Sequence, residues 1–243
     1  MLYIKMNKEN NFLDTLNDWG TILTDTYEDS TTFTIPNNIV DVPDYYFSKY
    51  IKNMDKKILY IGNHVKSIGQ NAFSNTPFGG IAFGDNSQLK SIGNFAFYNS
   101  NGLSGKITLP DTIENIGDYA FASTSLSDFN IPKNITALHI GTILNTNFDT
   151  LLIPSSVKFI DYSVFNNCFC NHDLVIPPTV EKIEAGAFDG LTVKIIYIPK
   201  HIKNNISLMK KGFEPIIPEA NFIRYNAKDY NKVLERALAN KYG

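Results

Sequence analysis

Residues 107–124 read Ile107-Thr-Leu-Pro-Asp-Thr-Ile-Glu-Asn-Ile-Gly-Asp-Tyr-Ala-Phe-Ala-Ser-Thr124. Their skeleton is h-x-h-Pro-x-x-h-x-x-Ile-Gly-x-x-Ala-Phe-x-x-Thr, where h is an apolar residue and x is any residue. Variants of this skeleton return at least seven times along the 243 residues. Self-similarity at a fixed period is typical of a repeat protein, in which each copy forms one unit of a stacked structure.

Two independent columns of residues keep the same period. The apolar residue before Pro or Gly recurs at intervals of 22 to 26 residues, and the residue closing the Ala-Phe pair follows 12 residues later in most coils. The first column is Ile35, Ile61, Phe83, Leu109, Ile131, Ile153, Ile176 and Ile198, and the second is Phe47, Phe73, Phe97, Phe121, Ile143, Phe165 and Phe188. Composition alone does not keep two columns in step, so we predict a solenoid of about eight coils.

Each coil is expected to contribute one short strand. Apolar residues alternate with a period of two before each Pro, as in Ile107 and Leu109, which indicates a strand with one buried face. Stacked coils bury these faces against each other as one core and place the strands in a parallel sheet along one face of the solenoid. Gly69, Gly93 and Gly117 follow a later apolar column, and we expect turns with positive φ there.

The segment Ile176-Pro-Pro-Thr-Val-Glu-Lys-Ile-Glu-Ala-Gly-Ala-Phe188 carries the pattern Ile-Pro-x-x-Val-x-x-Ile-x-x-x-Ala-Phe. This pattern resembles the BspA-type leucine-rich repeat, and the resemblance covers roughly residues 31–210. It implies a leucine-rich-repeat-like solenoid. Members of that family resemble one another mainly as bacterial and protist surface or interaction proteins, adhesins included, and phage-encoded versions exist. The resemblance implies no catalytic residues.

The ends of the chain depart from the repeat. Residues 1–30 carry an apolar stripe at helical spacing and are predicted to form an N-terminal cap, followed by the solenoid over residues 31–211. Residues 212–243 are predicted to form a C-terminal cap with an amphipathic helix over 227–241. That helix either seals the last coil or binds a partner.

The composition is that of a soluble globular protein, with 43% hydrophobic and 19% charged residues and a net charge of −2. This charge gives no general attraction to nucleic acid or to an anionic membrane. No apolar run is long enough to span a membrane, and the N-terminus lacks the basic start and apolar core of a signal peptide. We therefore expect no nucleic-acid binding, no membrane insertion and a cytoplasmic protein, or an extracellular surface protein if a leader was removed.

Residues whose side chains could serve catalysis or metal binding are accounted for by the repeat. The chain has no phosphate-binding Gly-rich loop, no nucleophile elbow and no His-Glu-x-x-His motif. Cys168, Cys170 and His172 lie close together in sequence, but Cys168 occupies a column that holds Thr or Ser in other coils. We expect two buried thiols, surface histidines in separate coils, and neither a metal site, a cofactor nor an enzyme.

The residue between the two buried apolar residues of each strand must point outward. This outward column is Thr34, Tyr60, Ala82, Thr108, Asn130, Leu152, Val175 and Tyr197. Its C-terminal part is apolar, and an exposed apolar stripe indicates a surface that binds another protein. The candidate partner-binding surface is Tyr60, Leu152, Phe159, Val175 and Tyr197. Alternatively, residues 212–243 fold back over this stripe.

The sequence therefore favours a non-enzymatic protein–protein interaction module that presents a solenoid sheet surface. Two alternative functions stay open. The first is a structural subunit of an assembly such as a phage virion, with self-association through the caps or the sheet. The second is a surface adhesin domain without its leader.

Overall fold

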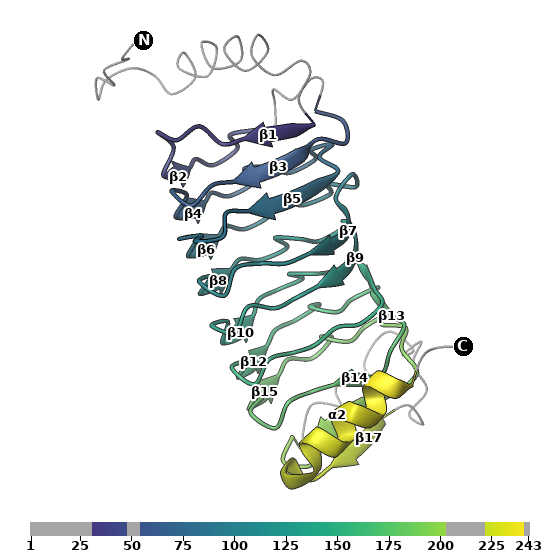
Figure 1. The fold of residues 1–243 in the computed structure, drawn as a ribbon. Coiled ribbons are helices and arrows are strands. Elements are labelled where there is room, and N and C mark those ends of the chain that lie inside the picture. The colour runs from purple at the N-terminus through teal and green to yellow at the C-terminus, as the bar shows by residue number, and fades with distance from the viewer. Residues whose placement is uncertain (1–30, 48–53, 203–221, 241–243) are drawn as a thin grey trace, which may run out of the picture.

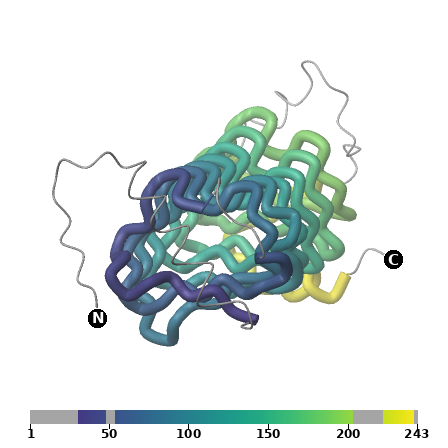
Figure 2. The backbone as a smooth tube through the Cα atoms, turned by 90° about the horizontal axis from the view of Figure 1, so that it is seen from above, coloured from purple at the N-terminus to yellow at the C-terminus, as the bar shows by residue number. Residues whose placement is uncertain are grey.

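The computed structural model describes residues 31–47, 54–202 and 222–240. These residues stack as coils of a parallel β-solenoid, with a helix at the C-terminal end (Figure 1). Viewed from above, successive coils lie over one another (Figure 2). The predicted repeat solenoid with a C-terminal helix is confirmed.

The strands form two ladders on different sides of the coils, and each described pairing is parallel. The first ladder contains β1 (Thr32–Thr34), β3 (Ile58–Ile61), β5 (Gly80–Phe83), β7 (Ser104–Ile107), β9 (Ser125–Phe129), β11 (Asn147–Phe148), β13 (Phe169–Cys170), β14 (Leu174–Val175), β16 (Ile196–Pro199) and β17 (Phe222–Tyr225). The second contains β2 (Asp41–Val42), β4 (Ser67–Ile68), β6 (Ser91–Ile92), β8 (Asn115–Ile116), β10 (Ala137–Leu138), β12 (Phe159–Ile160) and β15 (Lys182–Ile183).

The first ladder is divided in the middle coils. Its two ends form the sheets β1-β3-β5 and β14-β16-β17, whereas β7 pairs with β9 and β11 pairs with β13. The β7–β9 register shifts between Gly105 and Lys106, and its last pair is Ile107 with Phe129. Thr108 and Asn130, the next residues of the two coils, therefore lie beyond the paired segment. Residues of the outward column therefore belong to hydrogen-bonded strands at both ends of the solenoid but not in its middle.

A single apolar core runs through the coils from Phe33 to Ile202. The Phe column forms a stack in which the ring centroids of Phe73 and Phe97 lie 5.3 Å apart and those of Phe97 and Phe121 lie 5.1 Å apart. In the next coil Ile143 is 2% exposed and takes the place of the ring. Each stacked pair of rings contributes about 0.5–1.5 kcal/mol beyond the stabilisation from the apolar area that it buries. This column therefore ties each coil to its neighbours.

The turn glycines serve close packing rather than positive φ, so that expectation was wrong. Gly69, Gly93 and Gly117 are not among the described residues with positive φ. A Cβ atom on Gly117 would lie 2.9 Å from the carbonyl carbon of Gly93, and one on Gly93 would lie 2.8 Å from that of Gly69. No side chain fits at that distance from backbone, so glycine is required where one coil passes directly over another.

Apart from Lys56 and Gly105, the described residues with positive φ lie two residues before or after the buried Phe column. Around Phe73 they are Asn71, with φ of 54°, and Asn75, with φ of 57°. In the following coil Phe95 and Asn99 take the same conformation. Asparagine adopts the left-handed region more readily than other non-glycine residues, which explains why it recurs at these turns.

The C-terminal region contains the predicted helix and one strand that the repeat pattern did not predict. The helix consists of a 3₁₀ turn, η3 (Ala227–Asp229), followed by α2 (Tyr230–Ala239). The missed strand is β17, in which Phe222 pairs with Ile196 of β16. This interval of 26 residues is one that the repeat already uses. The signal was obscured because Arg224 stands where earlier coils have the apolar residue of Ile198.

The predicted N-terminal cap at residues 1–30 lies outside the described residues, as does most of the segment between the last coil and β17. The domain boundaries at residues 30 and 211 stay predictions.

Candidate functional site

The outward column is open to solvent at Leu152 and covered in the last coils. Val175 and Tyr197 are only 4% and 2% exposed, so the prediction that they point into solvent was wrong. Leu152, in the coil before them, is 50% exposed. The physical reason is α2, which lies across β14 and β17 at the end of the solenoid (Figure 1). The alternative that the C-terminal segment folds back over the stripe holds for these two residues.

The apolar face of α2 makes a small second core with the outward face of the last coils. Ala237 is fully buried there together with Val175, Tyr197 and Tyr225. Partly buried residues of α2 and of the strand side complete the cluster: Ile195, Tyr230, Val233 and Leu234. The Tyr225 hydroxyl donates a hydrogen bond of 2.6 Å to the Ile176 carbonyl, which fixes the segment before the helix to the solenoid.

A polar contact holds the C-terminal end of α2. Asn240 Nδ2 donates to Asp173 Oδ2 at 2.7 Å, and Lys194 Nζ donates to Asn240 Oδ1 at 2.9 Å. Burial raises the pKa of the Asp173 carboxyl, while the hydrogen bond from Asn240 and the charges of Lys194 and Arg236 act against that rise. The second carboxylate oxygen of Asp173 is buried without a hydrogen-bond partner.

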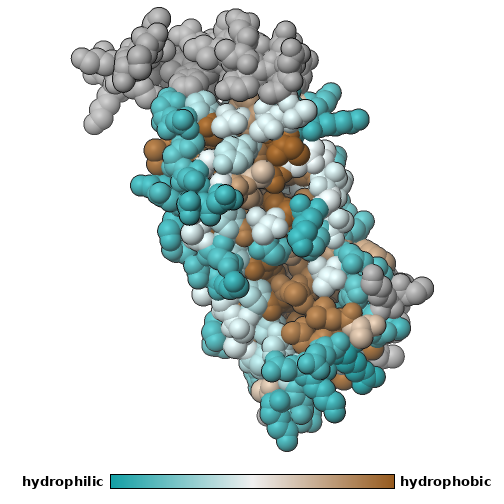
Figure 3. Space-filling model, viewed as in Figure 1, coloured by the Kyte–Doolittle hydropathy of each residue, from teal (hydrophilic) through white to brown (hydrophobic). Residues whose placement is uncertain are grey.

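A groove of about 1030 Å³ opens on the same face beside α2. Its floor comes from the middle coils, where the first ladder is divided, and its end wall comes from α2. On the space-filling view, hydrophobic side chains gather on this face toward the C-terminal end (Figure 3). The outward residues of the floor are Ala82, Thr108, Asn130, Leu152 and Val175, and the wall residues are Tyr230, Leu234 and Leu238.

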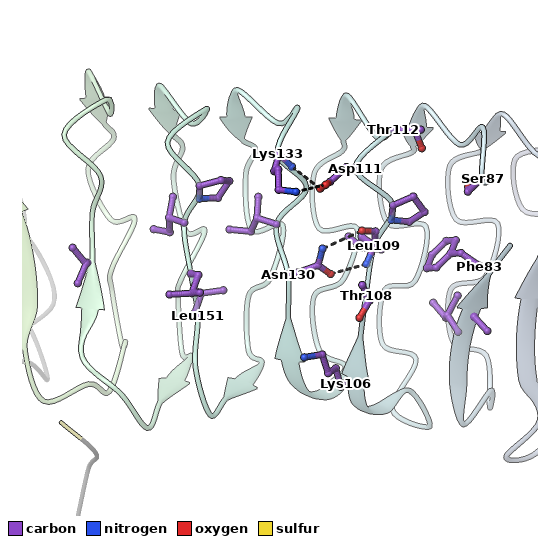
Figure 4. Close-up of a pocket in the computed structure, with 18 of the residues that line it drawn as sticks. Phe83, Ser87, Lys106, Thr108, Leu109, Asp111, Thr112, Asn130, Lys133 and Leu151 are labelled. Atoms are coloured by element: carbon purple, nitrogen blue, oxygen red, sulfur yellow. Dashed lines mark hydrogen bonds and ion pairs between the residues drawn. The ribbon is translucent and has the colours of Figure 1, made fainter. Parts of the chain in front are cut away.

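Polar side chains hold the middle coils together along this floor (Figure 4). Asn130 Oδ1 accepts a hydrogen bond of 2.6 Å from the Leu109 N–H, and Asn130 Nδ2 donates to the Leu109 carbonyl at 3.0 Å. Lys133 Nζ lies 2.7 Å from Asp111 Oδ2 in the adjacent coil. This hydrogen bond lowers the pKa of Asp111 and raises that of Lys133.

Two of the five predicted surface residues lie elsewhere. Phe159 belongs to β12 in the second ladder, where Lys182 Nζ lies 5.4 Å from its ring centroid. Tyr60 lies in β3 and is half-buried, outside the lining of the groove. The structure therefore brings together Leu152 and Val175 in one groove. The sequence predicts Tyr230, Leu234 and Leu238 on the apolar face of the C-terminal helix but not their place in the groove, because periodicity within a helix does not reveal where the helix docks.

The thiols and the nearby histidine have structural partners. Cys168 and Cys170 are buried free thiols, as predicted, and burial raises the pKa of Cys168 to about 12. Cys168 Sγ donates to the Ile143 carbonyl at 3.0 Å. His172 is 7% exposed rather than at the surface, and its Nδ1 lies 2.9 Å from Thr150 Oγ1. Across the described residues, no three His, Cys, Asp or Glu side chains cluster in a way that suits a metal ion.

In the ranges that the structure describes, no helix has the length and apolar character needed to cross a membrane.

A family model described as BspA type leucine rich repeat region matches the chain in six copies, over residues 21–147, 51–172 and 90–208. No curated protein matches the chain. Among solved structures, the chain is similar to a leucine-rich cell surface protein from Faecalibacterium prausnitzii, with 20% identity, a TM-score of 0.45, and coverage of 71% of this chain and 64% of that protein.

A leucine-rich repeat protein from Eubacterium ventriosum gives 19% identity and a TM-score of 0.44, with coverage of 70% of this chain and 60% of that one. The T. pallidum leucine-rich repeat protein gives 17% identity and a TM-score of 0.38, with coverage of 76% and 85%. The chain thus spans less than two thirds of the Faecalibacterium and Eubacterium proteins that it matches.

Proposed function

Because the chain belongs to the BspA-type leucine-rich repeat family, we propose that it is a non-enzymatic scaffold that binds another protein through the groove beside α2. The observation that carries this proposal is the 50% exposure of Leu152 on the groove floor. Large apolar side chains that line a concave surface favour association, because a partner that covers them removes apolar area from water.

Four of the five charged side chains that line the groove, all except Asp85, make structural contacts, which supports binding rather than chemistry. Lys133 pairs with Asp111, and Lys106 Nζ lies 3.1 Å from Asp128 Oδ2. Asp173 accepts the hydrogen bond from Asn240. These side chains are engaged in holding coils or α2 in place. None of them forms the pairing of a nucleophile with a base, or of an acid with a base, that catalysis requires.

A photo-crosslinking amino acid at position 152 tests the proposal, with the same amino acid at position 162 as the control. Tyr162 is also 50% exposed, and it does not line the groove. In extracts of cells that express the chain, we expect an adduct with one identified protein from position 152 and none from position 162. The purified partner should then bind the wild-type chain and lose at least tenfold in affinity for Leu152→Asp.

Equal adducts from both positions, or an affinity that Leu152→Asp leaves unchanged, would overturn the proposal. An adduct of two copies of the 27.3 kDa chain from position 152 would instead indicate a self-assembling structural subunit.

A further inference from the structure

The chain itself shows which kind of element fits its outward column. Val175 and Tyr197 are nearly inaccessible because the apolar face of α2 lies on them. Leu152 continues the same column by one coil and is uncovered. Since the covered and open positions belong to one column, the open part continues an interface that an amphipathic helix already occupies.

The groove also has a helical wall. Tyr230, Leu234 and Leu238 follow one another at intervals of four residues, so they lie along one side of α2. All three line the groove, and Leu238 is 39% exposed. A second helix laid along the floor would therefore contact the outward residues below it and, at one of its ends, this side of α2.

Other recognition modes fit this face less well. Addition of a β-strand needs free backbone groups at a sheet edge, whereas the backbone N–H and carbonyl of Leu109 point along the solenoid and are both bound by Asn130. Proline-rich segments dock in aromatic-lined grooves. The two aromatic residues that line this groove, Phe83 and Tyr230, lie at its opposite ends, so no row of aromatic rings covers the floor. Phosphopeptides require free cationic groups, and both Lys106 and Lys133 are paired with carboxylates.

The length of the floor defines the length of the occupant. Ala82 and Leu152, the ends of the uncovered floor, are separated by three coil-to-coil steps, which at about 4.8 Å per step gives a length of about 14 Å. A helix rises about 1.5 Å per residue, so about 10 residues span that floor.

We infer that the groove binds the apolar face of an amphipathic helix of a partner protein, of about 10 residues, laid along the floor over Leu152 with one end against α2. This inference rests on the proposed function and specifies its partner. The recognition would depend on apolar residues of the partner helix at positions i, i+4 and i+7 or i+8, which lie on one face.

A library of random 15-residue peptides, displayed without a structural constraint and selected on the full chain, tests the inference. Leu152→Asp serves as the counter-target during selection. The enriched peptides are then synthesised, and their dissociation constants are measured by fluorescence anisotropy. We expect apolar residues at helical spacing and at least tenfold weaker binding to both Leu152→Asp and Leu238→Asp. Binding to the control Tyr162→Asp should change less than twofold.

A proline placed at a central, solvent-facing position of the peptide distinguishes helical from extended binding, because proline disrupts a helix interior. We expect this peptide to bind at least tenfold more weakly. Leu152-dependent peptides that tolerate the proline and show alternating apolar residues would overturn the helix and leave the proposed function intact. If no selected peptide depends on Leu152, both proposals fail. Circular dichroism of each variant verifies that the solenoid is folded.

Discussion

The side chain of Asn130 binds both backbone polar groups of Leu109 in the adjacent coil. Its Oδ1 accepts from the Leu109 N–H at 2.6 Å and its Nδ2 donates to the Leu109 carbonyl at 3.0 Å. The contact lies just beyond the last β7–β9 pair, Ile107 with Phe129. One amide thus replaces ladder hydrogen bonds where the strand pairing has ended, and it holds together two coils that form the groove floor.

Replacing Asn130 with Ala should destabilise the solenoid by about 1–3 kcal/mol, because Leu109 is left with two unsatisfied backbone groups. Leu109 is 2% exposed, so water has little access to them. Urea unfolding followed by circular dichroism measures the change. The control is Asn101→Ala, since the exposed Asn101 side chain donates, among the described residues, to that of Asn99. Equal stability of the two variants would show that the Leu109 groups are satisfied in another way.

Gly117→Ala should destabilise the protein by about 1–3 kcal/mol, because overpacking against fixed backbone forces the coils apart. The added Cβ would lie 2.7 Å from the Asn94 backbone nitrogen and 2.9 Å from the Gly93 carbonyl carbon. The matched control is Gly80→Ala in β5, where the new Cβ would meet the Ile58 Cδ1 atom at 3.0 Å. Ile58 is exposed, so its side chain can move away from the new Cβ. Gly80→Ala should therefore leave the stability unchanged or raise it. Thermal unfolding measures the stability of both variants. Equal stability of Gly117→Ala and Gly80→Ala would show that close packing does not require glycine at position 117.

The core of this protein could be predicted from the sequence, whereas the candidate site could be predicted only in part. Phe97 and Ile143 are buried where the repeat period places them, because stacking imposes the same environment on every coil. The period also places Leu152 on the outward face. It says nothing about α2, whose docking on Val175 and Tyr197 depends on contacts between segments remote in sequence. For the same reason, the place of Asn130 in the outward column did not predict its two hydrogen bonds to the Leu109 backbone.

Asp173→Asn should change the pH dependence of stability in a defined direction. Burial raises the pKa of Asp173 in the folded protein, so the folded state binds this proton more tightly than the unfolded chain does. The stability contributed by protonation is complete below the unfolded pKa of about 3.9 and is lost as the pH rises through the folded pKa. Relative to Asp173→Asn, the wild type should therefore gain stability as the pH falls through this window.

The opposite sign is expected for Asp111→Asn. The hydrogen bond from Lys133 lowers the pKa of Asp111, so the wild type should lose stability relative to that variant as the pH falls through the lowered pKa. Urea unfolding at a series of pH values measures both differences. Curves of the same sign for the two variants would contradict the assignment of burial as the dominant effect at Asp173.

Ala237→Asp should release α2 from the solenoid, because it places a charge without a partner at a fully buried position between the helix and the last coils. Ala239→Asp introduces the same residue into the same helix at an exposed position, so it reproduces any effect on helix propensity without touching the interface. Limited trypsin digestion reads out the release through cleavage at Lys228, Lys232 and Arg236. We expect cleavage in Ala237→Asp at least tenfold faster than in Ala239→Asp, which corresponds to a loss of about 1.4 kcal/mol of docking free energy.

The released helix also uncovers Val175 and Tyr197, so the apolar stripe should then run unbroken from Leu152 to the end of the solenoid. If both variants are cut at the same rate, the cluster around Ala237 does not hold the helix in place.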